Sequence, residues 1–447
     1  MTDDDATQAI GKAGAPTGEV VPPLRSDCDV LVIGGGPAGS TISTLLCRKG
    51  WRVSLLEKDR HPRFHIGESL LPRNMPILDE LGVMDEVRRI GVVKRGADFT
   101  LPGYEGYLMV DFSRALEPSQ PTAFQVKRSE FDEVLLRNAQ RTGVSIHEGV
   151  RATAVEFLSD DQIEVTAKDD AGAVKQWTAR FLVDASGRDT FLANRFGIKV
   201  RNRNHESAAL FAHFDNVVRR EGEEAGNISM YWFEHGWFWV IPLRESRVSV
   251  GAVCRPEYLK SRNGSSEDFF AETIRLCPDL VERMKNAVMV TETMAAGNFS
   301  YYSTRMFDNT YLLIGDAFAF IDPVFSTGVF LAMSGARSGA DVIDVRLRNP
   351  ALGRRLLARH ERRVAGWISA YSWFIYRFTS PAMKRLFMTR GNPLRIKSAL
   401  LSLMSGDTRP SMARSVRIAI FKTLYYLATV LDWRSSRQWR RDTRVTT

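Results

Sequence analysis

The chain has 447 residues, 44% hydrophobic and 25% charged, with a net charge of +9, which is ordinary for a globular enzyme of two or three packed units. It contains no run of 18 or more uncharged apolar residues, and its start, MTDDDATQ, lacks the basic and then apolar pattern of a signal peptide, so we expect a cytoplasmic protein. The four cysteines show no C-x-x-C spacing, which argues against a metal site and against a disulfide framework.

The first patterned stretch predicts a nucleotide-binding unit. Residues 1–26 are rich in Asp, Gly, Ala, Thr and Pro, and we expect them to form a disordered leader. Residues 29–53 then read as a buried strand, a tight turn and a helix, and the turn carries G-x-G-x-x-G at Gly34, Gly36 and Gly39. These glycines permit, in order, the turn, the approach of a pyrophosphate and the close packing of helix on strand.

An acidic residue follows where a ribose requires one. Glu57 ends the next predicted strand, residues 52–56, and an acid at about this distance from the glycines binds a ribose hydroxyl in dinucleotide-binding folds. G-x-G-x-x-G alone also occurs in ordinary glycine turns. The flanking strands and Glu57 together favour the nucleotide.

The segment after Glu57 is irregular before it becomes periodic. His61-Pro62 indicates an irregular strap, and residues 70–81 carry apolar side chains near helical spacing. Residues 90–101 read as a loop entering a strand, and Lys94 stands in that loop. A single lysine in such a place is ordinarily a solvated charge.

The middle of the chain adds a second strand and helix unit and then a run of strands. Ser129 is expected to cap an amphipathic helix that ends near Gly143, and residues 181–185 form an apolar strand leading into a DASGRD turn. From residue 210 to 299 short alternating strands follow one another. They predict an antiparallel sheet that can cover a substrate pocket.

Four motifs resemble those of flavin-dependent halogenases of the phenol and pyrrole type, within the wider class of group A flavin monooxygenase-like folds. They are HIGESLLP at 65–72, W-x-W-x-I-P at 237–242, GD…DP at 315–323 and S-T-G at 326–328. The resemblance covers about residues 27–340. It implies an α/β fold in which an FAD-binding Rossmann-like unit of the glutathione reductase type carries an inserted antiparallel β-sheet and a C-terminal helical lobe.

The resemblance also implies roles for individual positions. Lys94, with Arg95 as its competitor, matches the catalytic lysine at the end of a tunnel from the flavin. The backbone amides of Thr327 and Gly328 match a halide site, and two N–H groups at a helix N-terminus suit a chloride or bromide. The positions that match the binding of FAD are Gly34, Gly36, Gly39, Glu57, Lys58, Glu68, Ser69, Arg128, Asp316, Pro323, Gly328 and Val329.

The W-x-W-x-I-P motif matches a segment that shields the flavin from organic substrate. Its residues are Trp237, Trp239, Ile241 and Pro242. The plainer interpretation is an aromatic-rich core strand, because alternating Trp side chains pack well on a pleated face. The chain has Phe325 where tryptophan halogenases carry a glutamate before S-T-G, which places it nearer the phenol and pyrrole group.

The implied activity is a halogenation. Reduced FAD from a separate flavin reductase, O2, and chloride or bromide would give hypohalous acid, which reaches Lys94 and halogenates an electron-rich phenolic or pyrrolic ring, free or tethered to an acyl or peptidyl carrier protein. A flavin-dependent monooxygenase or a geranylgeranyl reductase-like oxidoreductase would share the glycine turn, Arg128 and the GD motif, but would not need Lys94 or the tryptophans. A non-catalytic flavin-binding relative is less favoured, because the halide and lysine positions are both filled.

The charge is divided unevenly along the chain. From Arg346 to the end there are 22 Lys and Arg against 4 acidic residues, a net +18, whereas the remainder holds 39 basic and 48 acidic residues, a net −9. We expect an FAD-binding domain at 27–204 and 300–345, a substrate-side β-sheet at 205–299, a helical lobe at 346–433 and a basic tail at 434–447. The basic lobe suggests an acidic carrier domain or an anionic membrane surface as partner, or else a solvated cap, and no nucleic acid is expected.

Overall fold

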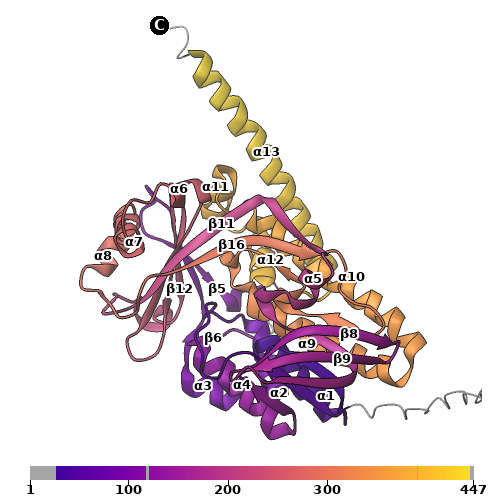
Figure 1. Ribbon diagram of the computed structural model, residues 1–447. Helices are drawn as coiled ribbons and strands as arrows, with labels where there is room; N and C mark the ends of the chain where they lie inside the picture. Colours follow the sequence, from indigo (N-terminus) through magenta and orange to yellow (C-terminus); the bar gives the residue numbers. More distant parts are fainter. Residues whose placement is uncertain (1–26, 117–119, 390, 443–447) are drawn as a thin grey trace, which may run out of the picture.

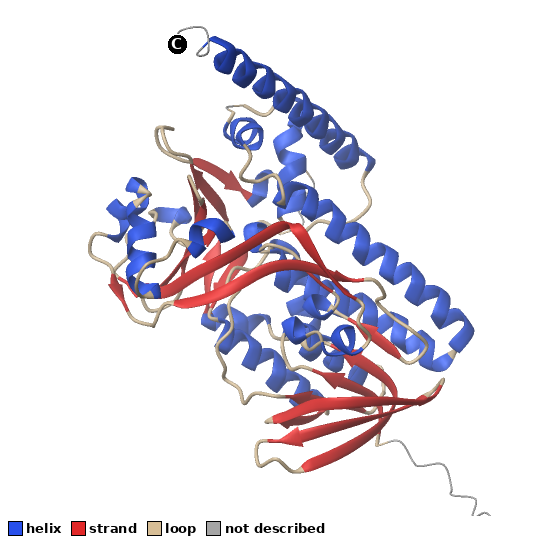
Figure 2. Ribbon diagram, turned by 45° about the horizontal axis from the view of Figure 1, so that its top comes forward, coloured by secondary structure: helices blue, strands red, loops and turns tan. Residues whose placement is uncertain are grey.

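The computed structural model describes residues 27–116, 120–389 and 391–442, so the expected leader at 1–26 lies outside the described residues. Two large β-sheets and a group of C-terminal helices make up this part of the chain (Figure 1). The two long strands β11 (Lys199–Asp215) and β16 (Met294–Ser303) run side by side and reach from the second sheet toward the first (Figure 2).

The first sheet holds the predicted nucleotide-binding strands. Its order is β7-β2-β1-β10-β9-β8, with β17 also paired to β10. The pairs among β7, β2, β1, β10 and β17 are parallel, which suits the buried, mainly apolar sequences of β1, β2 and β17, and β8 and β9 are antiparallel additions. The strands are β1 (Cys28–Ile33), β2 (Val53–Glu57), β7 (Ser145–Glu148), β8 (Val150–Ser159), β9 (Gln162–Asp169), β10 (Val174–Asp184) and β17 (Tyr311–Leu313).

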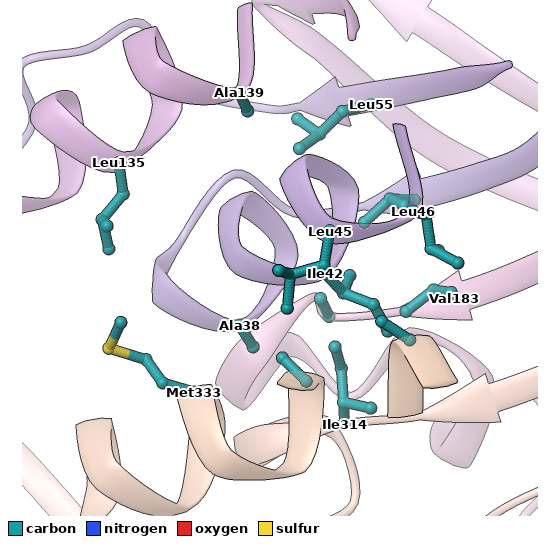
Figure 3. Close-up of a cluster of buried hydrophobic side chains, with 14 of the residues drawn as sticks. Ala38, Ile42, Leu45, Leu46, Leu55, Leu135, Ala139, Val183, Ile314 and Met333 are labelled. Atoms are coloured by element: carbon teal, nitrogen blue, oxygen red, sulfur yellow. The ribbon is translucent and has the colours of Figure 1, made fainter. Parts of the chain in front are cut away.

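Helices pack on this sheet through one apolar core. Figure 3 shows Ala38, Ile42 and Leu45 of α1 among side chains of β2, β10, α4 and α9. The helices of this part are α1 (Pro37–Arg48), α2 (Met75–Leu81), α3 (Met84–Ile90), α4 (Arg128–Thr142), α5 (Phe191–Arg195) and α9 (Thr327–Arg348), with a 3-10 turn at Pro72–Asn74 before α2.

The start of α4 differs from the sequence prediction. The helix begins at Arg128, its N-cap is Lys127, and no side chain of the described residues caps it, so the cap predicted at Ser129 is wrong. Ser129 instead lies in the first turn. The predicted end is confirmed, because Gly143 terminates the helix with φ +109°, a left-handed conformation that glycine adopts without strain.

The glycine turn brings helix backbone against strand backbone. Gly34 has φ +104°, and a Cβ atom built on it would lie 2.3 Å from the carbonyl oxygen of Ala185. A Cβ atom on Gly39, in the first turns of α1, would lie 1.8 Å from the carbonyl oxygen of Gly34. A side chain at Gly34 would therefore push the end of β1 away from the end of β10, and a side chain at Gly39 would push α1 away from the sheet.

The second sheet is the predicted run of strands with additions from elsewhere in the chain. Its order is β18-β16-β11-β14-β13-β12-β4-β5, with β15 paired to β11, and its pairs are antiparallel except for β12 with β4. Helices α6 (Pro256–Lys260), α7 (Ser266–Arg275) and α8 (Pro278–Met284) accompany it. The strands are β4 (Gly96–Thr100), β5 (Leu108–Asp111), β11 (Lys199–Asp215), β12 (Ile228–Phe233), β13 (Gly236–Pro242), β14 (Val248–Cys254), β15 (Val288–Met289), β16 (Met294–Ser303) and β18 (Ala319–Phe320).

The segment around Lys94 is more ordered than the sequence suggested. Instead of a loop entering a strand, it forms β3 (Gly91–Lys94), a bend at Arg95, and then β4. β3 pairs with β6 (Ala123–Val126) in a small separate sheet. The expectation of a loop was wrong, because the partner strand that orders β3 comes from about 30 residues further along the chain.

The C-terminal helices cover one face of the second sheet. They are α10 (Pro350–Ile375), α11 (Pro381–Met388), α12 (Ile396–Met404) and α13 (Met412–Asp442). The ring centroid of Phe378 lies 4.8 Å from that of Trp232, and the ring centroid of Phe387 lies 4.7 Å from that of Phe99. Helix α13 leaves the body of the molecule at its C-terminal end (Figure 1), and none of the helices in the described residues is long and apolar enough to span a bilayer.

The close approach of α1 to β1 gives a test of the fold. We expect Gly39→Ala to lower the free energy of unfolding by at least about 1–3 kcal/mol, because the added methyl group meets backbone that cannot move aside. Chemical denaturation followed by circular dichroism measures the change. The control is Gly366→Ala in α10, where the methyl group meets open space and should leave stability unchanged or raise it by up to about 1 kcal/mol. Equal stabilities for Gly39→Ala and the wild type would contradict the close contact.

Candidate active site

The carboxyl ends of three parallel strands open onto one cavity of about 620 Å³. Gly34 and Gly36 follow β1, Ser186 and Gly187 follow β10, and Asp316 follows β17, and all five line the cavity. Ligands of open α/β sheets bind at this edge. The volume is ample for a large organic cofactor.

The glycine turn presents backbone N–H groups to this cavity. The N-cap of α1 is Gly36, and no side chain in the described part of the chain caps the helix, so its first amides are free to bind an anion. Oε2 of Glu57 accepts a hydrogen bond from the N–H of Gly35 at 2.5 Å, which fixes the carboxylate at the cavity wall. Lys58 also lines the cavity, and its Nζ lies 2.6 Å from Oδ2 of Asp189.

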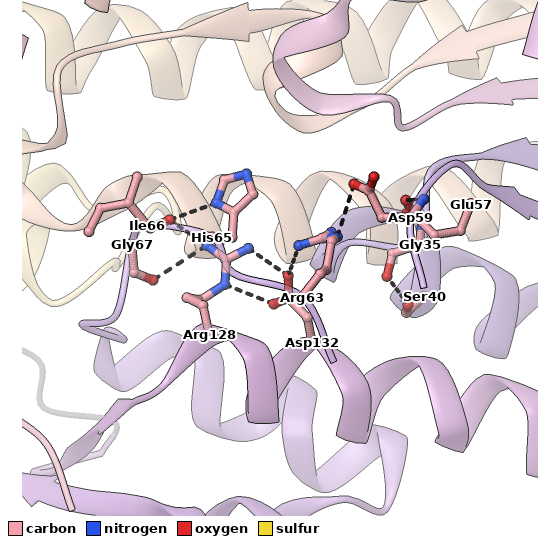
Figure 4. A network of polar contacts seen from close by, with 10 residues as sticks. All are labelled: Gly35, Ser40, Glu57, Asp59, Arg63, His65, Ile66, Gly67, Arg128 and Asp132. Carbon is pink, nitrogen blue, oxygen red and sulfur yellow. Dashed lines mark hydrogen bonds and ion pairs between the residues drawn. The ribbon is translucent and has the colours of Figure 1, made fainter. Parts of the chain in front are cut away.

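A buried network holds Arg128 at the cavity wall (Figure 4). Arg128 donates through Nε and Nη2 to the two carboxylate oxygens of Asp132 at 2.8 and 2.9 Å, and through Nη1 to the carbonyl of Ile66 at 2.8 Å. Arg63 donates to the same carboxylate at 3.1 Å. Burial opposes ionisation of Asp132, but the two guanidinium groups outweigh it and hold its pKa below the usual value. Burial and the charge of Arg128 lower the pKa of the neighbouring His65 to about 4, so its imidazole is neutral at pH 7.

Glu68 forms a second buried pair with a residue that sequence reasoning missed. Its Oε1 lies 2.8 Å from Nε2 of His213, and the two side chains are 1% and 4% exposed. Its other oxygen, Oε2, is buried with no hydrogen-bond partner among the described residues, although Glu68 lines the cavity. A polar atom in this position is available to a bound ligand. No sequence signal marked His213, which lies on β11, 145 residues away.

Asp316 contributes a further carboxyl group. It follows β17 in the GD motif and lines the cavity. Burial raises its pKa to about 6, and Arg188 and Arg128 oppose the rise. Near neutral pH this carboxyl group therefore takes up a proton more readily than an exposed aspartate does.

The start of α9 also borders the cavity. Pro323, Gly328 and Val329 line the cavity, whereas Thr327 does not. The N-cap of α9 is Ser326, and no described side chain caps the helix, so its first amides are free. The Thr327 side chain is buried, and its Oγ1 has no partner within the described residues.

The tryptophan motif lies on β13 and forms part of the cavity roof. Trp237, Trp239 and Ile241 line the cavity, and Pro242, at the end of the strand, does not. The ring centroids of the two tryptophans are 6.0 Å apart, and Nε1 of Trp239 donates to Oγ of Ser249 at 3.1 Å. Alternate residues of one strand thus turn two indoles toward the same space.

Lys94 lies just behind the cavity wall rather than in it. Its side chain is 2% exposed, and Nζ donates to Oγ of Ser69 at 2.8 Å and to the carbonyl of Leu70 at 3.2 Å. Ser69 lines the cavity, so one side chain separates the amine from it. Nζ also lies 5.3 Å from the ring centroid of Phe112. Burial lowers the pKa of Lys94 to about 7.

The neighbouring Arg95 has none of these properties. Its side chain is exposed, and its guanidinium lies 3.3 Å from Oε1 of Glu223. The bend that separates it from Lys94 is held by Asn227, whose Oδ1 accepts the N–H groups of Arg95 and Gly96 at 2.9 and 2.8 Å. Of the two basic residues in the KR pair, only Lys94 is buried beside the cavity.

The cavity fits FAD. Two uncapped helix starts, at α1 and α9, and the glycine backbone of the first turn match the pyrophosphate and other anionic or polar groups of this cofactor. A Cβ atom on Gly36 would have only the Arg63 guanidinium nearby, at 3.5 Å, so the glycine leaves the approach to the turn open. The buried Oε2 of Glu68 offers an acceptor to a group that the protein itself does not supply.

Comparison with known proteins agrees with this fit. The family described as FAD binding domain matches residues 27–367. A chlorinase of 1H-pyrrole-2-carbonyl groups on a peptidyl-carrier protein, from Pseudomonas fluorescens, is 29% identical over 405 residues, which cover 85% of this chain and 89% of that protein. The flavin-dependent halogenase armH1 of Armillaria mellea is 34% identical over 379 residues, which cover 79% of this chain and 71% of that protein.

Solved structures that superpose on this chain are also flavoproteins. A flavoprotein/dehydrogenase from Cytophaga hutchinsonii superposes with a TM-score of 0.83 and 28% identity, covering 91% of this chain and 99% of that one. The myxobacterial chondrochloren halogenase, an FAD-dependent enzyme, superposes with a TM-score of 0.75 and 31% identity, covering 90% of this chain and 96% of that one. The chain is an FAD-dependent oxidoreductase and belongs to the family of flavin-dependent halogenases.

Proposed function

We propose that this halogenase uses reduced FAD, O2 and chloride or bromide to halogenate an electron-rich phenolic or pyrrolic ring. The observation that carries the proposal is the position of Lys94, which is buried behind Ser69 at the wall of the FAD cavity. When bound and reduced, FAD supplies the activation of O2 that oxidises the halide. The residues of this chain bind the reactants, exclude water and pass the halogen to the substrate.

The start of α9 is the proposed halide site. The backbone N–H groups of Thr327 and Gly328 are the first amides of an uncapped helix, and they carry the positive end of its dipole. Because Gly328 and Val329 line the cavity, a halide held by these amides would lie beside the cofactor. The buried hydroxyl of Thr327, which has no partner in the described chain, supplies a further donor.

Lys94 is the proposed carrier of the halogen. No carboxylate of the described residues pairs with it, and burial alone brings its pKa to about 7, so a large share of the side chain is a neutral amine at physiological pH. A neutral amine attacks hypohalous acid at the halogen. The nitrogen–halogen bond forms as the oxygen–halogen bond breaks, and the amine proton leaves with hydroxide as water. The alternative role is an ammonium group that donates a hydrogen bond to hypohalous acid.

The substrate is proposed to be an aromatic acyl group on a carrier protein, with free phenols accepted less well. Support comes from the Pseudomonas fluorescens relative, which acts on a pyrrole-2-carbonyl group held by a peptidyl-carrier protein. The net charge of +18 from Arg346 onward suits an acidic partner domain. A separate flavin reductase is proposed to supply the reduced FAD.

Substitution of Lys94 tests the central proposal. We expect Lys94→Met and Lys94→Arg to abolish halogenation in an assay with FAD, a flavin reductase, O2, bromide and a simple phenol, because neither side chain becomes a neutral amine. Both variants should still bind FAD, and the control Arg95→Met should keep wild-type activity because Arg95 is exposed. More than about a tenth of wild-type turnover in Lys94→Met, about 1.4 kcal/mol in barrier, would contradict the role. Hydroxylated product from the wild type would indicate a monooxygenase instead.

The pH profile distinguishes the two roles of Lys94. The amine fraction rises as pH increases through the pKa of about 7, so the carrier role predicts that the halogenation rate rises over the same range. A rate that falls through this range would favour the ammonium role and contradict the carrier role. A profile without an inflection near pH 7 would contradict both.

The tryptophans on β13 are expected to keep the organic substrate away from the cofactor. Trp237→Leu with Trp239→Leu should shift the product ratio from halogenated toward hydroxylated ring or free hydrogen peroxide, since both indoles line the cavity. The control is Trp232→Leu on the adjacent strand, which is 1% exposed but does not line the cavity and should lose stability without a change in product ratio. If the folded double variant keeps the wild-type ratio of halogenated to hydroxylated product, the tryptophan motif serves only to pack the core.

Whether the substrate is free or tethered to a carrier protein can be tested by supplying the same aromatic ring in both forms. Turnover of a carrier-tethered acyl group should exceed that of the same ring in free form, and the difference should shrink as salt is raised, because salt screens docking of an acidic carrier. Rates measured for both forms from low to high salt check this. Equal rates with no salt dependence would remove the carrier from the proposal.

A further inference from the structure

Helix α13 carries an exposed row of apolar side chains that lies apart from the FAD cavity. At about 100° per residue, six of its large apolar residues fall within one sector about 120° wide. Leu427 is 57% exposed and Leu431 is 63% exposed. The members of this apolar row are Met412, Val416, Leu424, Leu427, Val430 and Leu431.

The row is not the face by which α13 packs on the protein. Phe421 and Tyr425 are 4% and 7% exposed and belong to the core beneath the helix. They lie on the helix about 60–180° away from the row, on the side that contacts α10, α11 and α12. Ile420 lies in the same sector but is partly buried against that core, so the second apolar face is left uncovered by the described residues chiefly from Leu424 to Leu431.

Aromatic rings and cations gather beside the row. The Arg377 guanidinium lies 4.7 Å from the ring centroid of Trp373, and Nζ of Lys422 lies 4.9 Å from the same centroid. Nε1 of Trp373 donates to the hydroxyl of Tyr426 at 3.2 Å, and Tyr426 is half exposed. Amphipathic Trp, Tyr, Lys and Arg side chains are enriched where an apolar medium meets water.

The positive charge of α13 favours a negatively charged surface as its partner. Residues 412–442 contain seven Lys and Arg and two Asp. Asp432, the one acidic side chain among the described side chains of α13, forms an ion pair with Arg385 of α11. Little negative charge is thus left to repel an anionic surface on this side.

We propose that α13 lies in the plane of an anionic lipid bilayer with the apolar row inserted at its interface. A bilayer provides both an apolar layer for the leucines and valines and negative headgroups for the cations. A second copy of this chain would bring like charge against like charge, and an acidic carrier domain would use the charge without a need for the apolar row. The inference does not depend on the proposed substrate.

Vesicle co-sedimentation of the full-length FAD-loaded protein tests this inference. We expect the wild type to sediment with vesicles that mix phosphatidylcholine and phosphatidylglycerol, more weakly with phosphatidylcholine alone, and less as salt is raised. The double variant Leu427→Glu with Leu431→Glu should lose at least about tenfold in vesicle affinity. The control Val174→Glu with Leu276→Glu adds the same charge at exposed apolar sites on other elements, and should bind vesicles almost as the wild type does.

The outcomes that would overturn the proposal are equally distinct. A wild type that stays in the supernatant, or a double variant that binds as well as the control, would exclude the bilayer as the occupant. A dimer seen by light scattering and broken by the double variant, without vesicle binding, would assign the row to a second copy. Carrier binding lost in the same variant, again without vesicle binding, would assign it to the carrier. Circular dichroism and the absorbance of bound FAD confirm that each variant is folded.

Discussion

The structure depends on the contact between the backbone of α1 and the backbone of β1. Because Gly34 and Gly39 have no side chains, the helix begins directly over the strand end and its amides face the cavity. The same helix is packed between α4 and α9 in the main core (Figure 3), so the ends of β1, β10 and β17 are held at one edge. A shift of α1 would disturb the glycine turn, the Arg128 network and the start of α9 together.

Charges around the cavity follow two different patterns. Arg128, Arg63 and Lys58 each have a carboxylate partner. Lys94 has only a hydroxyl and a carbonyl as partners, so burial disfavours its charged form. The fold thus fixes the cofactor site with permanent charges and leaves one amine that gains or loses a proton near neutral pH.

Local patterns predicted the parts of the fold that depend on neighbouring residues. The strand, glycine turn and helix of residues 29–53 and the start of α9 within S-T-G are both present, because turn chemistry and apolar runs determine them. The ion pair between Arg128 and Asp132 was also within reach, since the two residues are four apart on a predicted helix.

Contacts between distant segments could not be predicted from one sequence. The pairing of Glu68 with His213 spans 145 residues, and that of Arg63 with Asp132 spans 69. The order of β3 depends on β6, and the bend after it depends on Asn227, more than 130 residues away. The hydrophobic pattern of residues 90–101 gives no indication of these distant partners.

The bend at Arg95 has a consequence for how Lys94 is positioned. Lys94 is the last residue of the small sheet formed with β6, and Gly96, two residues later, is the first residue of β4 in the second sheet. The amine therefore stands at the joint between the FAD-binding part and the roof that carries the tryptophans. Because a single residue joins the two sheets, the position of the Lys94 amine relative to Ser69 is set by both of them.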